Sequence, residues 1–338
     1  MKNQNFRAWA NNRKTSRVAK YQTWRHRPLG AFVRAVEIAL IGAPLQQIVR
    51  SNNDIDEIKH LLPNLQEIGS EGDFVLSAAS VSTKNGLILL ESGHIIAPHL
   101  NSHNYLSGNL HDEVKFLIRK NPESTPHEFV FMLPKQEYFY HFLIDILPQI
   151  LRINVMVRNL VVLVNSNESA YIFSYLELHN LKCERTSAKS VLTNSIIAVK
   201  YYSQDASKVR SLLLNAQINT DALPAMPAKI AILRFRGSRH DDVFEIKLQK
   251  HLKTRGFEIY DPDTLSVPEQ IKLFSGASEI FAIHGGVLAN LIYCCKGTTV
   301  HEIFTHPYRT MFFEALSRDL GLIYSSSEAA AYIFESLP

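Results

Sequence analysis

Two polar residues stand four positions apart in an aromatic and apolar segment, where their types and spacing suit acid–base chemistry. His141 and Asp145 lie in the run Tyr-Phe-Tyr-His-Phe-Leu-Ile-Asp-Ile-Leu-Pro, whose apolar spacing predicts a helix over residues 137–151. Residues four apart share one face of a helix. A carboxylate beside an imidazole can orient the ring, which a general base for a hydroxyl nucleophile requires. The same pair in a partly buried helix can also be purely structural.

A second candidate is a glycine turn between a predicted strand and a predicted helix. The stretch Ile-His-Gly-Gly-Val-Leu-Ala-Asn contains His284, Gly285, Gly286 and Asn290. Adjacent glycines let the backbone turn sharply and approach a ligand. The N–H groups at a helix start attract an anion, most readily a phosphate or diphosphate. Because tight strand-to-helix turns often contain Gly-Gly, this turn alone leaves a structural role open.

Three arginines are expected near this turn. Arg234, Arg236 and Arg239 follow a predicted strand at residues 229–233. Loops after parallel strands converge at one edge of a sheet, so these side chains should lie near His284. The guanidinium group offers planar, permanently charged donors that suit phosphate oxygens, although a solvated basic loop would look the same.

One carboxylate interrupts the predicted strand at residues 299–304. Glu302 lies near the end of that strand, beside His301. At such a position a carboxylate can accept both hydroxyls of a ribose, or it can pair with one of the arginines. The sequence leaves both interpretations open.

Other polar groups are interpreted as structural. The Asp-Pro-Asp run at residues 261–263 follows a strand and should form a turn that caps the next element. Cys294 and Cys295 end an apolar helix and should lie in the core. No CxxC or HExxH spacing occurs in the chain, so the sequence contains no zinc pattern. We expect no cofactor.

The elements that would position these residues alternate between strands and helices. The predicted strands are residues 129–133, 160–164, 195–199, 229–233, 257–260, 279–283, 299–304 and 322–324. The predicted helices are residues 137–151, 168–178, 206–216, 243–255, 266–276, 287–293 and 311–320. A small β meander is expected at residues 72–100, and two prolines mark a linker at residues 218–228. Such alternation predicts α/β units with parallel sheets, and two joined units suggest a ligand cleft.

Composition bounds the class of protein. The chain has 338 residues, of which 46% are hydrophobic and 20% charged, as in ordinary globular proteins of about two domains. Three cysteines, two of them adjacent, favour a reducing compartment. The longest charge-free apolar stretch, residues 280–295, is shorter than the about 20 residues of a membrane span. With no signal-peptide core at the N-terminus either, we expect a cytoplasmic protein.

The charge is distributed unevenly. Residues 1–50 carry ten Lys or Arg side chains and one acidic side chain, whereas the remainder carries 26 basic and 31 acidic side chains. Nucleic-acid binders usually spread basic residues over the folded surface, so we expect no nucleic-acid partner. A basic arm with apolar residues suits an anionic membrane surface. A solvated tail followed by a helix packed on the body explains the arm equally well.

Taken together, the ordered segments resemble glycosyltransferase family 61. The similarity covers roughly residues 129–324 and rests on the segments 138–148, 256–259 and 265–270, on Arg234, and on His284, Gly285, Leu288, Asn290 and Glu302. The last group resembles the family's pattern His-Gly-Ala-Gly-Leu-Thr-Asn, followed by a strand ending in Glu. Here Gly286, Val287 and Ala289 depart from that pattern, and the family's Asn is missing before Glu245.

The resemblance implies a GT-B fold with two Rossmann-like domains facing across a cleft. The expected order is a basic arm at residues 1–50, an acceptor-side domain at 51–217, the linker at 218–228 and a nucleotide-sugar-binding domain at 229–338. It also implies inversion at the anomeric carbon without a metal, because arginines would neutralise the leaving diphosphate.

The resemblance also implies roles for the candidate residues and partners for the protein. The catalytic residues would be His141 and Asp145, and the nucleotide-sugar-binding residues would be Arg234, Arg239, His284, Gly285, Gly286, Asn290 and Glu302. The partners would be a nucleotide sugar and a glycan or glycolipid acceptor, in capsule or lipopolysaccharide assembly at the inner face of a bacterial membrane. A polysaccharide pyruvyltransferase or another GT-B-like enzyme, and a non-catalytic tether with this fold, remain as alternatives.

Overall fold

The chain divides into two compact units that alternate along the sequence. The computed structural model describes residues 48–49, 66–68, 73–83, 86, 88–90, 95–96, 123–133, 138–198, 205–215, 223–233, 242–305 and 309–329. The first unit comprises Met1–Lys135, Ile153–Glu168 and Leu181–Tyr202, and the second comprises Gln136–Arg152, Ser169–Asn180 and Ser203–Pro338. The start of the helix that carries His141 thus groups with the second unit, whereas the sequence assigned it to an N-terminal domain at residues 51–217.

The first unit is built on a mixed sheet. The strands are β1 (Ile48–Val49), β2 (Gln66–Ile68), β3 (Asp73–Ser82), β4 (Ile88–Leu90), β5 (Ile95–Ile96), β6 (Glu123–Ser124), β7 (Phe129–Met132), β8 (Leu160–Asn165), β9 (Cys183–Thr186) and β10 (Ser190–Ala198). The main order is β1-β5-β4-β3-β10-β7-β8-β9. The predicted meander is confirmed as antiparallel β3, β4 and β5, but it joins the parallel strands β7, β8 and β9 through β10. The sequence missed β9 because Cys-Glu-Arg-Thr has no apolar alternation.

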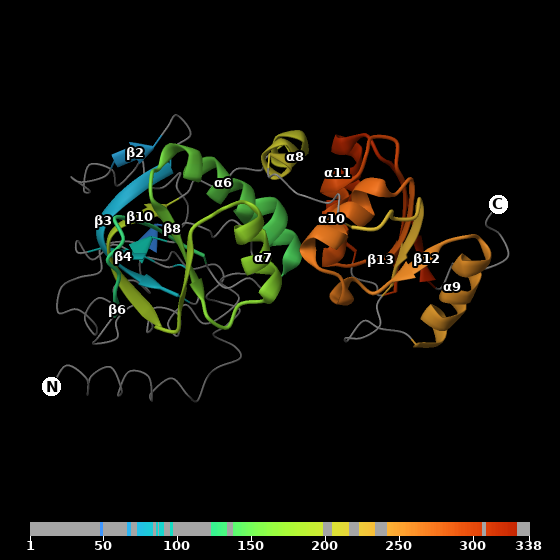
Figure 1. The fold of residues 1–338 in the computed structure, drawn as a ribbon, viewed down its shortest axis with the longest axis horizontal. Helices are drawn as coiled ribbons and strands as arrows, with labels where there is room; N and C mark the ends of the chain where they lie inside the picture. Colours follow the sequence, from blue (N-terminus) through green and yellow to red (C-terminus); the bar gives the residue numbers. More distant parts are fainter. Residues whose placement is uncertain are drawn as a thin grey trace, which may run out of the picture. The chain divides into compact units, whose positions relative to one another are not determined.

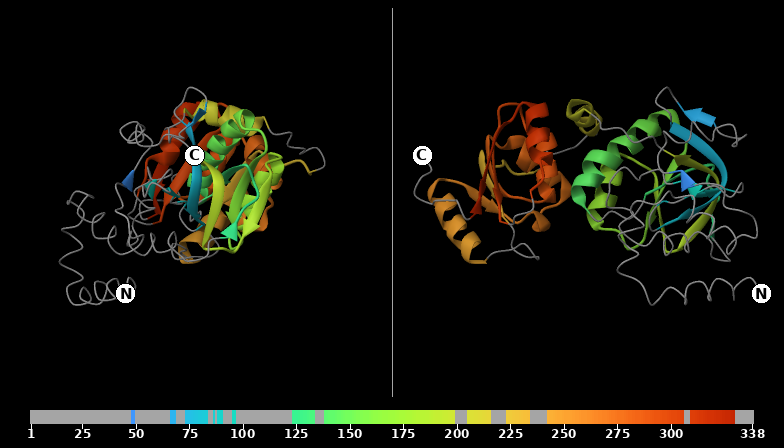
Figure 2. Two further views of the ribbon diagram at one scale, coloured as in Figure 1. Left: turned by 90° about the vertical axis from the view of Figure 1, so that its left-hand side faces the viewer. Right: turned by 180° about the vertical axis from the view of Figure 1, so that it is seen from behind.

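The second unit contains a parallel sheet of five strands. They are β11 (Lys229–Ile232), β12 (Glu258–Tyr260), β13 (Glu279–Ile283), β14 (Thr299–Phe304) and β15 (Ile323–Glu328), in the order β12-β11-β13-β14-β15. Figure 1 shows α9 (Asp242–Thr254) on one side of this sheet, with α10 (Val267–Gly276) and α11 (Phe312–Leu320) on the other. The same layers are seen from behind in Figure 2 (right). The α/β class expected from the alternation is confirmed.

The helices of the second unit begin and end where local chemistry dictates. In α9, Leu248 and Leu252 pack on the buried side chains of β11 and β13. That helix is followed by Gly256 at φ 81°, a conformation that costs glycine little. A capping box begins α10, since the Ser266 N–H donates to Glu269 Oε2 at 2.7 Å and the Glu269 N–H donates to Ser266 Oγ.

Further helices are α8 (Ala206–Leu214), α7 (Ala170–Leu178) and a longer helix containing η2 (His141–Ile146) and α6 (Leu147–Met156). A 3₁₀ helix, η4 (Gly286–Tyr293), replaces the α-helix predicted at residues 287–293. Within the described ranges, no helix combines the length and the apolarity that crossing a membrane requires.

Candidate active site

The predicted pair of His141 and Asp145 forms in the structure. His141 Nδ1 lies 2.6 Å from Asp145 Oδ2, and both side chains are mostly buried, with 15% and 16% of their surface exposed. A ring held at Nδ1 by a carboxylate has a fixed orientation, and proton exchange with a substrate would then go through Nε2. The pair therefore has the geometry that a general base requires.

The helix that carries the pair is widened into a π-helix, which the sequence did not predict. The Leu147 N–H donates to the Phe142 carbonyl five residues earlier, so this hydrogen bond encloses one residue more than the hydrogen bonds of an α-helix do. Pro148 lacks an N–H and its ring opposes the carbonyl four residues before it, which favours such a widening. Gln149 Nε2 then donates to the Asp145 carbonyl at 2.8 Å. Single π-turns of this kind are frequent at functional sites.

A second histidine–carboxylate pair lies at the glycine turn. His284 Nδ1 is 2.6 Å from Glu302 Oε1, and the Tyr324 hydroxyl donates to Glu302 Oε2 at 2.5 Å. Glu302 is fully buried. Both of its oxygens are therefore engaged by side chains of this unit. The position of Tyr324 gave no signal in the sequence because its strand, β15, is polar and largely exposed.

Aromatic rings connect the two pairs. The Phe312 ring lies 6.3 Å from the His141 ring and stacks on Tyr140 at 5.1 Å. Tyr140 in turn meets Phe313 at 5.6 Å, and Phe313 lies 5.7 Å from His284. We call these three rings, Tyr140, Phe312 and Phe313, the aromatic wall. Both histidines thus border one packed set of rings within the second unit.

The aromatic wall is a low-dielectric surrounding. Burial raises the pKa of the Tyr140 phenol, with smaller contributions from the negative charges of Asp145 and Asp319. Burial also raises the pKa of Tyr324, and the hydrogen bond and charge of Glu302 act in the same direction. Both phenols therefore stay protonated at neutral pH and can act as hydrogen-bond donors.

The glycine turn approaches the helix that carries His141. A Cβ added at Gly286 would lie 3.6 Å from Phe139 Cβ, an ordinary contact distance. Gly285 has φ 177°, extended backbone that any residue adopts. The turn thus packs directly on the start of the helix, within the second unit.

Asn290 lies in the interior. Its Nδ2 donates to Gln270 Oε1 at 3.0 Å, and its Oδ1 accepts from the Tyr175 hydroxyl at 3.4 Å. Gln270 Nε2 donates to the carbonyls of Pro262 and Leu265. The Asn290 side chain is fully buried, and its hydrogen bonds hold η4 against α10 and α7.

The strand order supports a ligand site at the same edge. Numbered along the chain, the five strands lie in the order 2-1-3-4-5, and ligands of such sheets bind where the order reverses, beyond the carboxyl ends of the strands. That switch point lies between β11 and β13, whose ends are followed by Arg234 and His284. Arg234 and Arg239 themselves lie outside the described residues, as do most of residues 1–50.

Comparison with known proteins identifies the family. Residues 139–301 match the family model Glycosyltransferase 61. This segment belongs to glycosyltransferase family 61. The resemblance inferred from the sequence is confirmed, and the protein is a glycosyltransferase. No curated protein gives a significant match.

One similar solved structure is the bacterial iron-containing dodecameric glycosyltransferase TibC from enterotoxigenic E. coli H10407. It shares 10% sequence identity with this glycosyltransferase at a TM-score of 0.32, and the match covers 71% of this chain and 77% of that chain.

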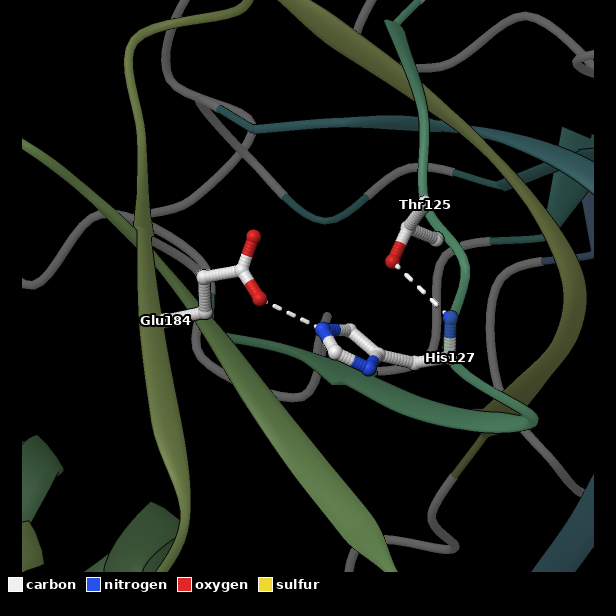
Figure 3. A network of polar contacts seen from close by, with 3 residues as sticks. All are labelled: Thr125, His127 and Glu184. Carbon is white, nitrogen blue, oxygen red and sulfur yellow. Dashed lines mark hydrogen bonds and ion pairs between the residues drawn. The ribbon is translucent and has the colours of Figure 1, made fainter.

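A third histidine–carboxylate pair lies in the first unit of the glycosyltransferase. Figure 3 shows the His127 ring directed at Glu184 on β9, with Nε2 2.5 Å from Oε2, while the His127 N–H points to Thr125 Oγ1. The Glu184 side chain is 54% exposed, so water screens this pair and it contributes little to stability. It joins the start of β7 to the edge strand β9 within the first unit.

The residues interpreted as structural in the glycosyltransferase have mixed outcomes. The Asp263 N–H donates to Asp261 Oδ1 at 3.1 Å, so the turn interpretation is confirmed. Cys294 is buried as expected, whereas Cys295 is exposed, because the 3₁₀ helix ends at Tyr293 and the chain then turns outward. Among the described residues, no three His, Cys, Asp or Glu side chains cluster in a way that could hold a metal ion.

Proposed function

We propose that this glycosyltransferase moves a sugar from a nucleotide-sugar donor to a hydroxyl of a glycan or glycolipid, with inversion and without a metal. In this scheme His141, oriented by Asp145, removes the proton of the acceptor hydroxyl while the oxygen attacks the anomeric carbon. The observation that carries the proposal is the aromatic wall, which joins the His141–Asp145 pair to the His284 turn inside one compact unit.

The donor diphosphate would bind at the switch point between β11 and β13. The turn at Gly285 and Gly286 lies at this edge, and Arg234 and Arg239 follow β11 in the sequence. Positive charge at this edge would stabilise the leaving diphosphate as the glycosidic bond breaks. In this proposal the glycine turn contacts the donor through backbone N–H groups, and the arginine loop contacts it through positively charged side chains.

Two of the expected donor ligands receive a different role in this proposal. Glu302 is buried and hydrogen-bonded to His284 and Tyr324. It would therefore orient the His284 ring toward the donor instead of binding the ribose. Asn290 would hold η4, and with it the turn, through Gln270 and Tyr175. Both are positioning residues.

The cellular context is part of the proposal as well. The basic arm at residues 1–50 supports work at an anionic membrane surface, as in capsule or lipopolysaccharide assembly. The GT-B arrangement of two domains around a cleft stays a prediction from the family resemblance. The family match favours sugar transfer over pyruvyl transfer.

The test begins with a screen of nucleotide sugars by thermal shift, since a ligand of the folded state raises the unfolding temperature. With the donor known, His141→Ala should lower turnover by about 10²–10⁴-fold with donor affinity retained, and Asp145→Asn should lose less. Arg234→Ala should weaken donor binding by about 1.5–3 kcal/mol, the value of a charge-assisted hydrogen bond. Activity should persist in EDTA.

The matched control is His127→Ala, which removes an imidazole with the same kind of carboxylate partner from the first unit. It should leave turnover within about twofold, because a screened surface pair contributes little. Near-normal turnover of His141→Ala would make that histidine structural and leave Asp145 as the candidate base. Loss of activity in EDTA that is restored by added metal would contradict the metal-free scheme.

A further inference from the structure

Two exposed aromatic rings make edge contacts with the imidazole of His141. Among the described residues, the exposed aromatic side chains are Tyr138, with 51% of its surface accessible, and Phe312, with 47%. They come from the start of the helix that carries His141 and from the start of α11. Single exposed apolar residues need no explanation, but two exposed rings in contact with the same candidate base do.

The two rings have similar geometry toward the histidine. The Tyr138 centroid lies 6.1 Å from that of His141 with an interplanar angle of 74°, and the Phe312 centroid lies 6.3 Å away at 77°. Both rings therefore stand nearly perpendicular to the imidazole. Tyr140 stacks on Phe312 at 5.1 Å with an interplanar angle of 20°, so Phe312 is held in place although it is exposed.

We propose that Tyr138 and Phe312, which we call the acceptor platform, bind the sugar ring that carries the attacking hydroxyl. This inference rests on the proposed function, in which His141 takes the proton of that hydroxyl. A pyranose ring has faces lined by C–H groups, which pack on aromatic rings, and a rim of hydroxyls. In this proposal, a sugar ring packed on the platform turns its rim toward His141.

The chemistry of the platform favours a sugar over a lipid chain. A base must lie within hydrogen-bond reach of the proton that it removes, so the group nearest His141 has to carry a hydroxyl. Tyr138 adds a phenolic oxygen that can exchange hydrogen bonds with a neighbouring hydroxyl while its ring packs on the C–H face. An acyl chain would use the apolar area but would bring no nucleophile.

The experiment reads acceptor binding without turnover, by saturation-transfer NMR with methyl hexopyranosides of the gluco, galacto and manno series. Tyr138→Ala and Phe312→Ala should each weaken binding of the preferred glycoside by about 3- to 10-fold, the value of one aromatic ring contact. Phe312→Leu should also weaken it, because leucine keeps the apolar area but not the flat face. Nucleotide affinity should be unchanged in all three variants.

Val155→Ala is the matched control, since Val155 is an exposed apolar residue at the other end of the same helix, in α6. It should leave glycoside binding unchanged. The proposal is overturned if no methyl glycoside binds the wild-type protein saturably, or if both alanine variants bind as the wild type does. It is also overturned if octyl glycosides bind better than methyl glycosides and this gain disappears in Phe312→Ala but not in Phe312→Leu, which would indicate a lipid site.

These outcomes are separate from a failure of the proposed function. Near-normal turnover of His141→Ala would remove the base assignment but would leave glycoside binding to the acceptor platform unaffected. Conversely, unchanged glycoside binding in the alanine variants would remove the acceptor platform while leaving the kinetics of His141 to be interpreted as before.

Discussion

Replacing Tyr324 by Phe removes the hydroxyl that hydrogen-bonds to Glu302, a fully buried carboxylate of the candidate site. That hydroxyl donates to Glu302 Oε2 at 2.5 Å, while the other carboxylate oxygen accepts from His284 at 2.6 Å. The Glu302 side chain is 0% exposed. Water therefore has no access to replace the lost donor. In the variant, the Glu302 carboxylate would lose the Tyr324 hydroxyl and keep its hydrogen bond with His284.

The expected loss follows from these contacts. A hydrogen bond to a charged group contributes about 1.5–3 kcal/mol, and the buried oxygen left behind adds a desolvation cost, so we expect the free energy of unfolding to fall by about 2–3 kcal/mol. For a unit of this size that corresponds to about 4–12 °C in unfolding temperature. The raised pKa of Tyr324, caused first by burial and then by Glu302, agrees with a hydroxyl held as a donor.

The chain supplies a matched control in the same sheet. The Tyr260 hydroxyl also donates to a glutamate, Glu258 Oε2, at 3.1 Å, but this pair lies at the surface. Tyr260→Phe should change the free energy of unfolding by no more than about 0.5 kcal/mol.

The assay is urea and thermal unfolding of the wild type and both variants at pH 7, combined with nucleotide affinity. Tyr324→Phe should weaken nucleotide binding as well, because His284 loses part of its orientation, whereas Tyr260→Phe should not. If Tyr324→Phe is as stable as Tyr260→Phe, the buried carboxylate does not depend on the hydroxyl and the reasoning is refuted.

Three further predictions concern other parts of the chain. Gly286→Ala should fold, remain active and raise the free energy of unfolding by about 0.4–1 kcal/mol. The new Cβ would lie 3.6 Å from Phe139 Cβ, an ordinary contact distance, and alanine has fewer backbone conformations than glycine in the unfolded chain. Lost activity in a folded variant would show that a ligand needs the space beside Gly286. Burial lowers the pKa of His179 from 6.5 to about 4, so the unfolded state binds the proton first and stability should fall between pH 6.5 and 4. Urea titrations should show a flatter pH slope in His179→Gln, and equal slopes would contradict this. Deleting residues 1–28 should release the protein from anionic vesicles with the fold intact, and undiminished sedimentation with vesicles would exclude the arm as the anchor.

The strands, helix ends and i, i+4 contact of the second unit were predictable because they depend on residues close together in the sequence. Buried strands such as β13 read as continuous apolar runs. The capping box at Ser266 and the glycine after α9 mark helix ends through hydrogen bonds and backbone angles that involve only a few residues. The i, i+4 spacing of His141 and Asp145 fixed their pairing for the same reason.

What the sequence by itself determined is therefore the α/β class, the family and the pairing of His141 with Asp145. The tertiary structure decided the partners of Glu302, because His284 and Tyr324 lie 18 and 22 residues away and are brought to it by the register of parallel strands. It also decided that the helix of His141 packs on the glycine turn. Contacts between distant segments depend on how the helices and sheets pack on one another. The residue types within one segment therefore do not predict which aromatic rings and carboxylates from other segments will contact it.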